Sequence, residues 1–449
     1  MTIVKKISMI ALGSIFCGNS FAQVLTPHFT EESKRIVIPK DGAVSPEIHD
    51  GMITLHKYPQ QMFVNAKSGE YVWGTDFVFT RGNDFKTPYF SGGAMMAWRT
   101  KPNDFSASPF IIYLDGKYRN LPDDISNASS FVEGYALVHK GRSVVMGVKQ
   151  VFIDKNGKEV FPALASTQRG TMGDMTVYPV RENRRVFYNA ELKKYGYADE
   201  KGNIVIKPQF DKALNFSEGL AAVMTKENYV EMWGFIDLTG KMVIPAIYKL
   251  RPGRFSEGLA AVRTGDSDYE YEMTYIDKTG KTVMENQKWN LNEFHNGFAW
   301  VGTGCEKLFV MDKAFNEVRD LTQDFYHNGN GFGVCMFSML SGNVQDRVWG
   351  FDFPNGMQML HQEGVAAGDI FAPDGAILFQ AVDANGNRVS LHKMTEGDLM
   401  FCQIRMENAP QLKENDVYLS CFINKNGEIV YYFEEGDEGY EGITQTQIK

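Results

Sequence analysis

One phrase of eight residues occurs three times in the middle of the chain at a constant spacing. The phrase Phe-Ser-Glu-Gly-Leu-Ala-Ala-Val fills residues 216–223 and 255–262 without change, and residues 294–301 carry a looser copy. Its glycines, 39 residues apart both times, are Gly219, Gly258 and Gly297, and a more distant copy contains Gly134. A repeat of this period predicts an architecture in which each unit packs mainly on its neighbours.

A second phrase lies between the copies and consists of an aromatic-glycine pair followed by a turn. Its clearest form runs from Trp233 and Gly234 to Asp237 and Gly240. The aspartate can accept hydrogen bonds from the backbone N–H groups that follow it, and the glycine can adopt the positive φ that closes a hairpin. The equivalent turn residues elsewhere are Asp154, Asp199, Asp277 and Gly280. For the glycine of the first phrase we expect a β-bulge or a close approach of two backbones.

The segments between these turns predict strands. They are short, rich in Val, Ile, Phe and Tyr, and show no sustained helical period. Ten turns, and therefore ten units, are counted at residues 65, 115, 154, 199, 237, 277, 312, 352, 383 and 424, the one at 115 in a shortened form. We predict an all-β fold of tandem repeats of about 39 residues made of short antiparallel strands, either propeller-like or stacked as an open array.

The array is expected to span residues 47–449, with its best-preserved units at 131–301. An extended lead-in, residues 23–46, precedes it and contains neither phrase. The repeat is broken at residues 163–194 and 305–348, and a local function is expected there rather than at the repeated positions.

The two phrases resemble the WG repeat family of bacterial proteins. The hallmark of that family is an aromatic-glycine pair leading into Phe-Ile-Asp-x-x-Gly-Lys, with Phe-x-Glu-Gly-x-Ala-x-Val closing the unit. The resemblance is strong over residues 195–301 and fair over residues 131–162. It implies a β-rich repeat array, found in exported proteins among others, and it carries no common catalytic motif.

Residues 1–22 have the pattern of a secretory signal peptide. Lys5 and Lys6 precede a short apolar core, and a small-x-small cleavage site ends at Ala22, before Gln23. We therefore expect an exported protein, periplasmic or secreted. No second apolar run is long enough to cross a bilayer, so no integral membrane span is expected.

The charge of the mature chain argues against nucleic acid as a partner. Removal of the signal takes the formal net charge from -9 to -11, whereas nucleic acids and anionic membranes are bound by clustered Lys and Arg. The four remaining cysteines form no C-x-x-C pair. Buried free thiols are expected, and Cys402 with Cys421 is the pair best placed for a bridge.

Candidate chemical sites have simpler structural explanations. Asp154 and Asp383 lie in segments that resemble halves of a calcium loop, but such a loop needs a further acidic residue. His295 and His327 occupy the slot that holds serine in other units, and no nucleophile, metal or nucleotide motif occurs. Three aromatics, Trp98, Trp289 and Trp300, belong either to the core or to a sugar- or peptide-binding face.

No catalytic, cofactor or metal residues are therefore predicted. The favoured function is an exported, non-enzymatic binding or scaffolding module of the cell envelope, with a protein or glycan partner. The alternative is a carbohydrate-active enzyme or a lectin on a β-propeller, because a catalytic carboxylate pair needs only the right separation in space.

Overall fold

The computed structural model describes residues 23–38, 42–57, 60–71, 90–101, 104–141, 143, 145–170, 173–264, 272–303, 306–322, 370–371, 374–383, 386, 388–389, 391–405 and 418–435. These residues form nine small sheets, here called units 1 to 9 in ring order. Helix in this part of the chain is limited to two 3-10 turns, Pro162–Leu164 and Glu396–Asp398. The predicted all-β class is confirmed.

The strands of each unit are as follows. Unit 1 contains β3 (Ala43–His49), β4 (Met52–Lys57) and β5 (Gln60–Asn65), and unit 2 contains β6 (Ala94–Lys101), β7 (Asp104–Tyr113) and β8 (Tyr118–Asn120). Unit 3 contains β9 (Ile125–Ala128), β10 (Tyr135–Lys140), β11 (Val148–Asp154), β12 (Glu159–Val160) and β13 (Ser166–Gln168), and unit 4 contains β14 (Arg185–Asn189), β15 (Lys194–Ala198) and β16 (Ile204–Phe210). Unit 5 contains β17 (Lys212–Ala213), β18 (Leu220–Glu227), β19 (Val230–Asp237) and β20 (Met242–Tyr248), and unit 6 contains β21 (Leu259–Thr264) and β22 (Glu272–Asp277). Unit 7 contains β23 (Asn290–Leu291), β24 (Phe298–Gly302), β25 (Leu308–Asp312) and β26 (Glu317–Asp320). Unit 8 contains β27 (Ile370–Phe371), β28 (Ile377–Val382), β29 (Arg388–Val389) and β1 (Gln23–Leu25), and unit 9 contains β30 (Leu391–Thr395), β31 (Leu399–Arg405), β32 (Tyr418–Ile423), β33 (Glu428–Glu435) and β2 (His28–Ile38).

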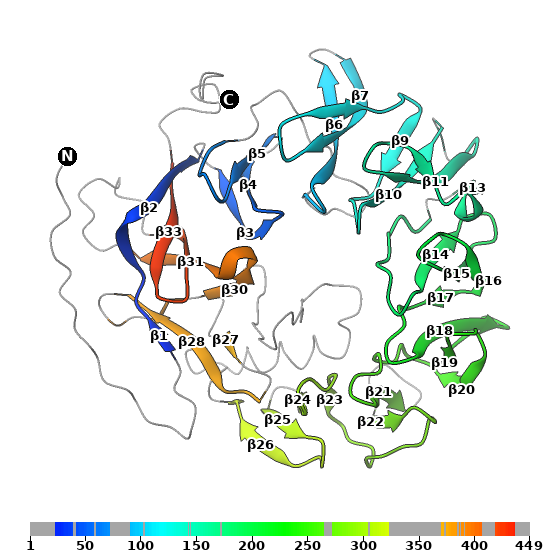
Figure 1. Cartoon of the computed structure of the whole chain (residues 1–449). Coiled ribbons are helices and arrows are strands. Elements are labelled where there is room, and N and C mark those ends of the chain that lie inside the picture. The colour runs from blue at the N-terminus through cyan, green and yellow to red at the C-terminus, as the bar shows by residue number, and fades with distance from the viewer. Residues whose placement is uncertain are drawn as a thin grey trace.

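The units follow one another around a ring, and the two ends of the chain meet in it (Figure 1). β2 pairs with β33, with Ile36 opposite Phe433, and β1 pairs with β28. These are the two parallel pairings among the named strands, and all the others are antiparallel. Residues that precede the repeats therefore supply the outer strands of units 8 and 9, and the arrangement is a propeller-like ring rather than a stack with separate ends.

The phenylalanine that opens the first phrase packs between its own unit and the preceding one. Its partner is the aromatic residue that comes before the turn of that preceding unit. The pairs and their ring-centroid distances are Tyr197–Phe216 at 4.9 Å, Phe235–Phe255 at 5.0 Å and Tyr275–Phe294 at 5.0 Å. Burial of one such ring contributes about 1.5–3 kcal/mol, and the aromatic pair adds roughly 0.5–1.5 kcal/mol. The two phrases thus recur together because they form one interface between units.

The counted turns agree with the units. Nine of the ten turns lie in nine different units, and the tenth, at residue 352, lies outside the described residues. One detail of the count is wrong. The turn near residue 115 is not shortened. Tyr113 N–H donates to the Lys117 carbonyl oxygen, and Gly116 N–H donates to the Tyr113 carbonyl oxygen. In the turn at Asp154, the Asp154 N–H donates to Lys158 O and the Gly157 N–H to Asp154 O in the same pattern. Tyr113 therefore occupies the position of the turn aspartate.

The glycine of the first phrase has a different role from the one expected. Ser217 and Leu220 exchange both backbone hydrogen bonds, and Glu218 and Gly219 between them have φ of 55° and 87°. Positive φ at both central residues is typical of a two-residue hairpin turn. No atom lies within 4 Å of a Cβ built on Gly219, so the glycine marks neither a bulge nor a close approach. The same turn occurs at Gly134, Gly258 and Gly297.

The close approach is found instead at the glycine of the Trp-Gly pair. A Cβ built on Gly234 would lie 2.6 Å from the Ile244 carbonyl oxygen and 2.7 Å from the Ala246 nitrogen. β20 bulges over this point, because its register with β19 shifts between Trp233 and Phe235. Gly196 has the same contacts with the backbone of β16. In the part of the chain that the structure describes, no helix has the length and apolar character needed to cross a membrane.

Candidate functional site

The glutamates of the first phrase connect consecutive units. Each carboxylate accepts a hydrogen bond from the backbone N–H of the glycine in the next such turn. The pairs and their O···N distances are Glu182–Gly219 at 2.8 Å, Glu218–Gly258 at 2.8 Å and Glu257–Gly297 at 3.0 Å. Burial opposes the ionisation of Glu218, but Lys278, 3.1 Å away, and the Gly258 N–H outweigh it and lower its pKa. These carboxylates therefore connect neighbouring units of the ring.

The turn aspartates are also occupied by their own turns. Asp237 Oδ1 accepts hydrogen bonds from the Thr239 hydroxyl at 2.6 Å, the Thr239 N–H at 2.9 Å and the Lys241 N–H at 3.0 Å. The hydrogen bond from Thr239 is the main reason why the pKa of Asp237 is lowered. The same backbone bonds are made by Asp154, Asp199 and Asp277. Among the described residues, no three His, Cys, Asp or Glu side chains gather as metal ligands would.

The turn glycines pack over the preceding unit. A Cβ built on Gly240 would lie 3.1 Å from Ile206 Cγ2, and one built on Gly280 would lie 3.1 Å from Ile244 Cγ2. Both glycines have positive φ. The repeated positions thus serve turns and contacts between units.

The histidine and tryptophans that the sequence singled out lie mostly in the core. Trp300 is 2% exposed, Trp98 packs on the core of units 2 and 3, and Trp289 lies edge-on to Phe309 at 5.4 Å. His295 is partly buried beside Glu293, at 3.8 Å, and burial lowers its pKa. His327 lies outside the described residues. None of the three tryptophans forms an exposed binding face.

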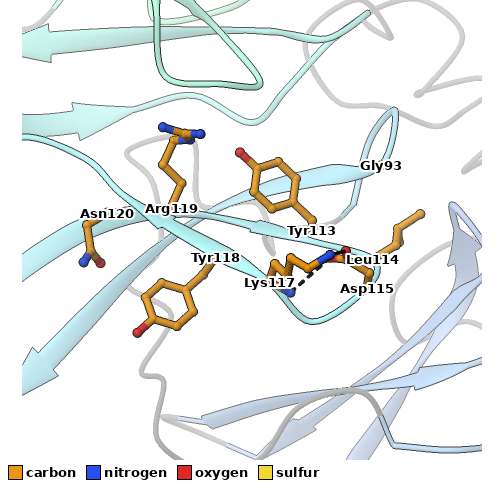
Figure 2. A pocket seen from close by; sticks show the side chains of 8 residues that line it. All are labelled: Gly93, Tyr113, Leu114, Asp115, Lys117, Tyr118, Arg119 and Asn120. Carbon is orange, nitrogen blue, oxygen red and sulfur yellow. Dashed lines mark hydrogen bonds and ion pairs between the residues drawn. The ribbon is translucent and has the colours of Figure 1, made fainter. Parts of the chain in front are cut away.

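An open hollow of about 730 Å³ lies at the outer hairpin of unit 2 (Figure 2). It is lined by Gly93, Tyr113, Leu114, Asp115, Lys117, Tyr118, Arg119 and Asn120. The Tyr118 ring is held edge-on to Phe110 at 6.0 Å, yet Tyr118 remains 48% exposed. Figure 2 shows Arg119 on the other side of the strand from Tyr118, as expected for successive strand residues.

The hollow exists where unit 2 departs from the repeat. Tyr113 replaces the turn aspartate, and its hydroxyl donates a hydrogen bond to the Lys155 carbonyl oxygen in unit 3 at 2.7 Å. Asp115 is engaged with Lys117 at 2.6 Å. Within the described residues Arg119 makes no hydrogen bond or ion pair, so its guanidinium can bind an anionic group. The exposed ring of Tyr118 can pack against an apolar face of a ligand, and the guanidinium on the other side of β8 can bind an acidic group.

The broken repeat at residues 163–194 contains a second polar cluster. Asp174 Oδ2 accepts hydrogen bonds from the hydroxyls of Tyr178 at 2.9 Å and Tyr195 at 3.0 Å. Burial, followed by the negative charge of Asp174, raises the pKa of both tyrosines. Gln150 Nε2 also donates to the Asp174 carbonyl oxygen at 3.1 Å. These tyrosines stay protonated as donors, so the cluster ties unit 3 to unit 4.

A buried arginine completes that interface. Arg185 is 1% exposed, donates to Glu133 Oε2 at 3.2 Å and to the Tyr178 carbonyl oxygen at 2.8 Å, and lies over the Tyr135 ring. Glu133 here bonds Arg185 and the Val180 N–H in place of the next turn glycine. At the broken repeat Glu133 therefore keeps a backbone hydrogen bond and adds an ion pair with the buried guanidinium of Arg185.

Comparisons with solved structures found distant likenesses to β-rich proteins. BamB from Moraxella catarrhalis is 10% identical over 66% of this chain and 88% of its own, with a TM-score of 0.32. A eukaryotic initiation factor is 11% identical over 93% of this chain and 92% of its own, with a TM-score of 0.36. The β-propeller domain of the Trilobed protease from Pyrococcus furiosus, described as having an open velcro topology, is 10% identical over 63% of this chain and 98% of its own, with a TM-score of 0.28. No curated protein matched the sequence.

A protein-family model matches two consecutive segments of the chain. The WG containing repeat matches residues 195–229 and 233–266. The first match runs from β15 of unit 4 to the β18–β19 turn of unit 5, and the second runs from β19 to the end of β21 in unit 6. Each repeat therefore spans the interface between two units, which is where the paired aromatic rings lie. The chain carries tandem WG-containing repeats at residues 195–266, as the resemblance of its two phrases predicted.

Proposed function

We propose that the protein is an exported, non-enzymatic binding or scaffolding module of the cell envelope and that it binds its partner at the hollow of unit 2. The observation that carries the proposal is that the hollow is lined by an exposed aromatic ring, Tyr118, on one side of β8 and by the guanidinium of Arg119 on the other. In contrast, the repeated Asp and Glu side chains are engaged in turns and in ties between units. The partner is a glycan or a protein segment that presents an acidic group.

The N-terminus supports the proposal of export. The first strand of the fold begins at Gln23, and the Gln23 side chain donates a hydrogen bond to the Lys425 carbonyl oxygen at 2.7 Å. Cleavage after Ala22 would therefore retain β1 and β2, the two strands that complete units 8 and 9.

The test compares the mature chain with two variants of the hollow, Tyr118→Ala and Arg119→Ala. Each is used to capture ligands from the envelope fraction of the producing bacterium and is then titrated with purified acidic and neutral envelope polysaccharides. Tyr229→Ala is the matched control, because Tyr229 is 91% exposed on unit 5. We expect at least a tenfold loss of affinity in both hollow variants, since a charged hydrogen bond contributes about 1.5–3 kcal/mol.

The outcomes separate the possible functions. Equal binding by the wild type and both hollow variants would refute the assignment of the hollow. Preference for an acidic polysaccharide, without turnover, would identify the module as a lectin. Hydrolysis that is abolished by one carboxylate substitution would show an enzyme and overturn the non-enzymatic proposal.

A further inference from the structure

Two buried thiols face each other in the sheet where the ends of the chain meet. Cys402 on β31 lies directly opposite Cys421 on β32, and the Sγ atoms are 3.3 Å apart. Both residues are 0% exposed. Their neighbours are the apolar side chains that join unit 9 to unit 8, Leu25 of β1 among them.

The positions of the two cysteines fit a covalent bond with little movement. Residues opposite each other in an antiparallel pair have Cβ atoms about 4.5–5.5 Å apart, and a disulfide requires roughly 3.5–4.5 Å. A shift of about 1 Å or less between β31 and β32 is therefore sufficient.

We propose that Cys402 and Cys421 form a disulfide when the chain folds in an oxidising compartment, and that this bond holds β31 to β32 in the closing unit. The proposal rests on the proposed export, because disulfides persist outside the reducing cytosol. The oxidant is a disulfide carried by a thiol oxidoreductase or by a small thiol compound. One cysteine thiolate attacks that disulfide and displaces the first thiolate, and the second cysteine thiolate attacks the mixed disulfide and displaces the other. The protein loses two electrons and two protons, and the oxidant becomes two thiols.

The bond must form before unit 9 has packed. The hydrogen bond with Cys402 and burial raise the pKa of the Cys421 thiol, which suppresses the thiolate that exchange requires. Complete burial also keeps an oxidant away from both sulfurs. A chain that has folded with reduced cysteines should therefore resist later oxidation.

The test uses the mature chain, residues 23–449, unfolded with reductant and then refolded in a glutathione redox buffer or in reductant alone. Free thiols are alkylated under denaturing conditions, and peptides are mapped by mass spectrometry without reduction. We expect a cross-linked Cys402–Cys421 peptide in most chains from the redox buffer and a higher thermal midpoint for them than for the reduced chains. Cys402→Ser is the control variant, in which Cys421 should be alkylated.

Two outcomes would refute the disulfide and the export separately. Full alkylation of Cys402 and Cys421 after refolding in the redox buffer, with the β-sheet circular dichroism of the folded chain, would refute the disulfide. Recovery of the chain from the cytosolic fraction of its own cells, with residues 1–22 retained, would refute export and leave the pairing intact, because the refolding test does not depend on where the chain is made.

Discussion

The glycine of the Trp-Gly pair is a position where a single methyl group should damage the fold severely. In Gly234→Ala the new Cβ would lie 2.6 Å from the Ile244 carbonyl oxygen, 2.7 Å from the Ala246 nitrogen and 2.8 Å from the Pro245 carbonyl carbon. All three are backbone atoms of the bulge in β20, so no side-chain rotation can relieve the contact. The strand itself must move away from β19.

The expected loss of stability can be judged by comparison with Gly219, where space is available but the backbone conformation disfavours a side chain. Gly219 has open space around it but a φ of 87°, and an L side chain in the left-handed region costs about 1–2 kcal/mol. Overpacking costs typically 1–3 kcal/mol and sometimes more. Because the new Cβ would meet three successive backbone atoms of β20, we place Gly234→Ala at roughly 3 kcal/mol or above. Gly219→Asn should recover part of the Gly219→Ala loss, because asparagine tolerates positive φ.

The assay is chemical unfolding of the mature chain followed by tryptophan fluorescence, in which Trp233 reports on the affected unit because it is only 5% exposed. We expect the midpoints to fall in the order wild type, Gly219→Asn, Gly219→Ala, Gly234→Ala. A midpoint for Gly234→Ala at or above that of Gly219→Ala would refute the reasoning. In that case the approach of β20 to Gly234 would be adjustable, and the pair would need another explanation.

Three further predictions follow from the turns and from one buried histidine. Gly258→Val should lower the thermal midpoint more than Ser256→Ala, because a β-branched residue at a φ of 88° is strained. The serine change removes only one hydrogen bond to the Phe294 carbonyl, which contributes about 1 kcal/mol. Equal thermal midpoints for the two variants would contradict this prediction. Asp237→Asn should keep its turn, as Asn424 does in unit 9, and Asp237→Ala should not. The pKa of Asp237 is lowered in the folded chain. The ionised carboxylate therefore stabilises the fold above pH 3.8, the ordinary pKa, and this stabilisation is lost as the pH falls through the pKa of the folded chain. Unfolding curves at neutral and acidic pH should show a smaller loss of stability with acid in Asp237→Asn than in the wild type. Burial lowers the pKa of His139 below 6.5, so the folded chain should lose stability as the pH falls below 6.5, and an unchanged slope in His139→Gln would refute that assignment.

The sequence predicted the local features of the fold well because each depends on a few neighbouring residues. An aspartate followed by glycine three residues later is enough to specify a turn, and five of the nine described turns have this pattern, at Asp154, Asp199, Asp237, Asp277 and Asp383. The chain closure was not predictable in the same way. The Gln23 side chain contacts a carbonyl 402 residues away, at Lys425, and β2 contains neither phrase. Pairing at such separation leaves no periodic signal in the chain.

The candidate site was missed for a related reason. The prediction assigned function to the stretches where the repeat is broken, and one of them contains structural groups, Asp174 and the buried Arg185, whose partners could be known only from the packed units. The hollow lies in unit 2, in a turn that keeps its length. The sequence feature that could have indicated the hollow is Tyr113, which stands where other turns have aspartate. The count of turns interpreted this substitution as a shortened turn at residue 115.

This substitution suggests how a ring of similar units acquires a binding site. A turn aspartate satisfies its own N–H groups, and the turn glycine then packs on the preceding unit, as Gly240 does on Ile206. Tyr113 cannot cap its own turn in this way, and its hydroxyl instead reaches Lys155 in the following unit. The fold tolerates the change because the backbone bonds of the turn are retained. In the unit that we propose to bind a ligand, one capping residue is thus replaced without a change in the strands that hold the ring together.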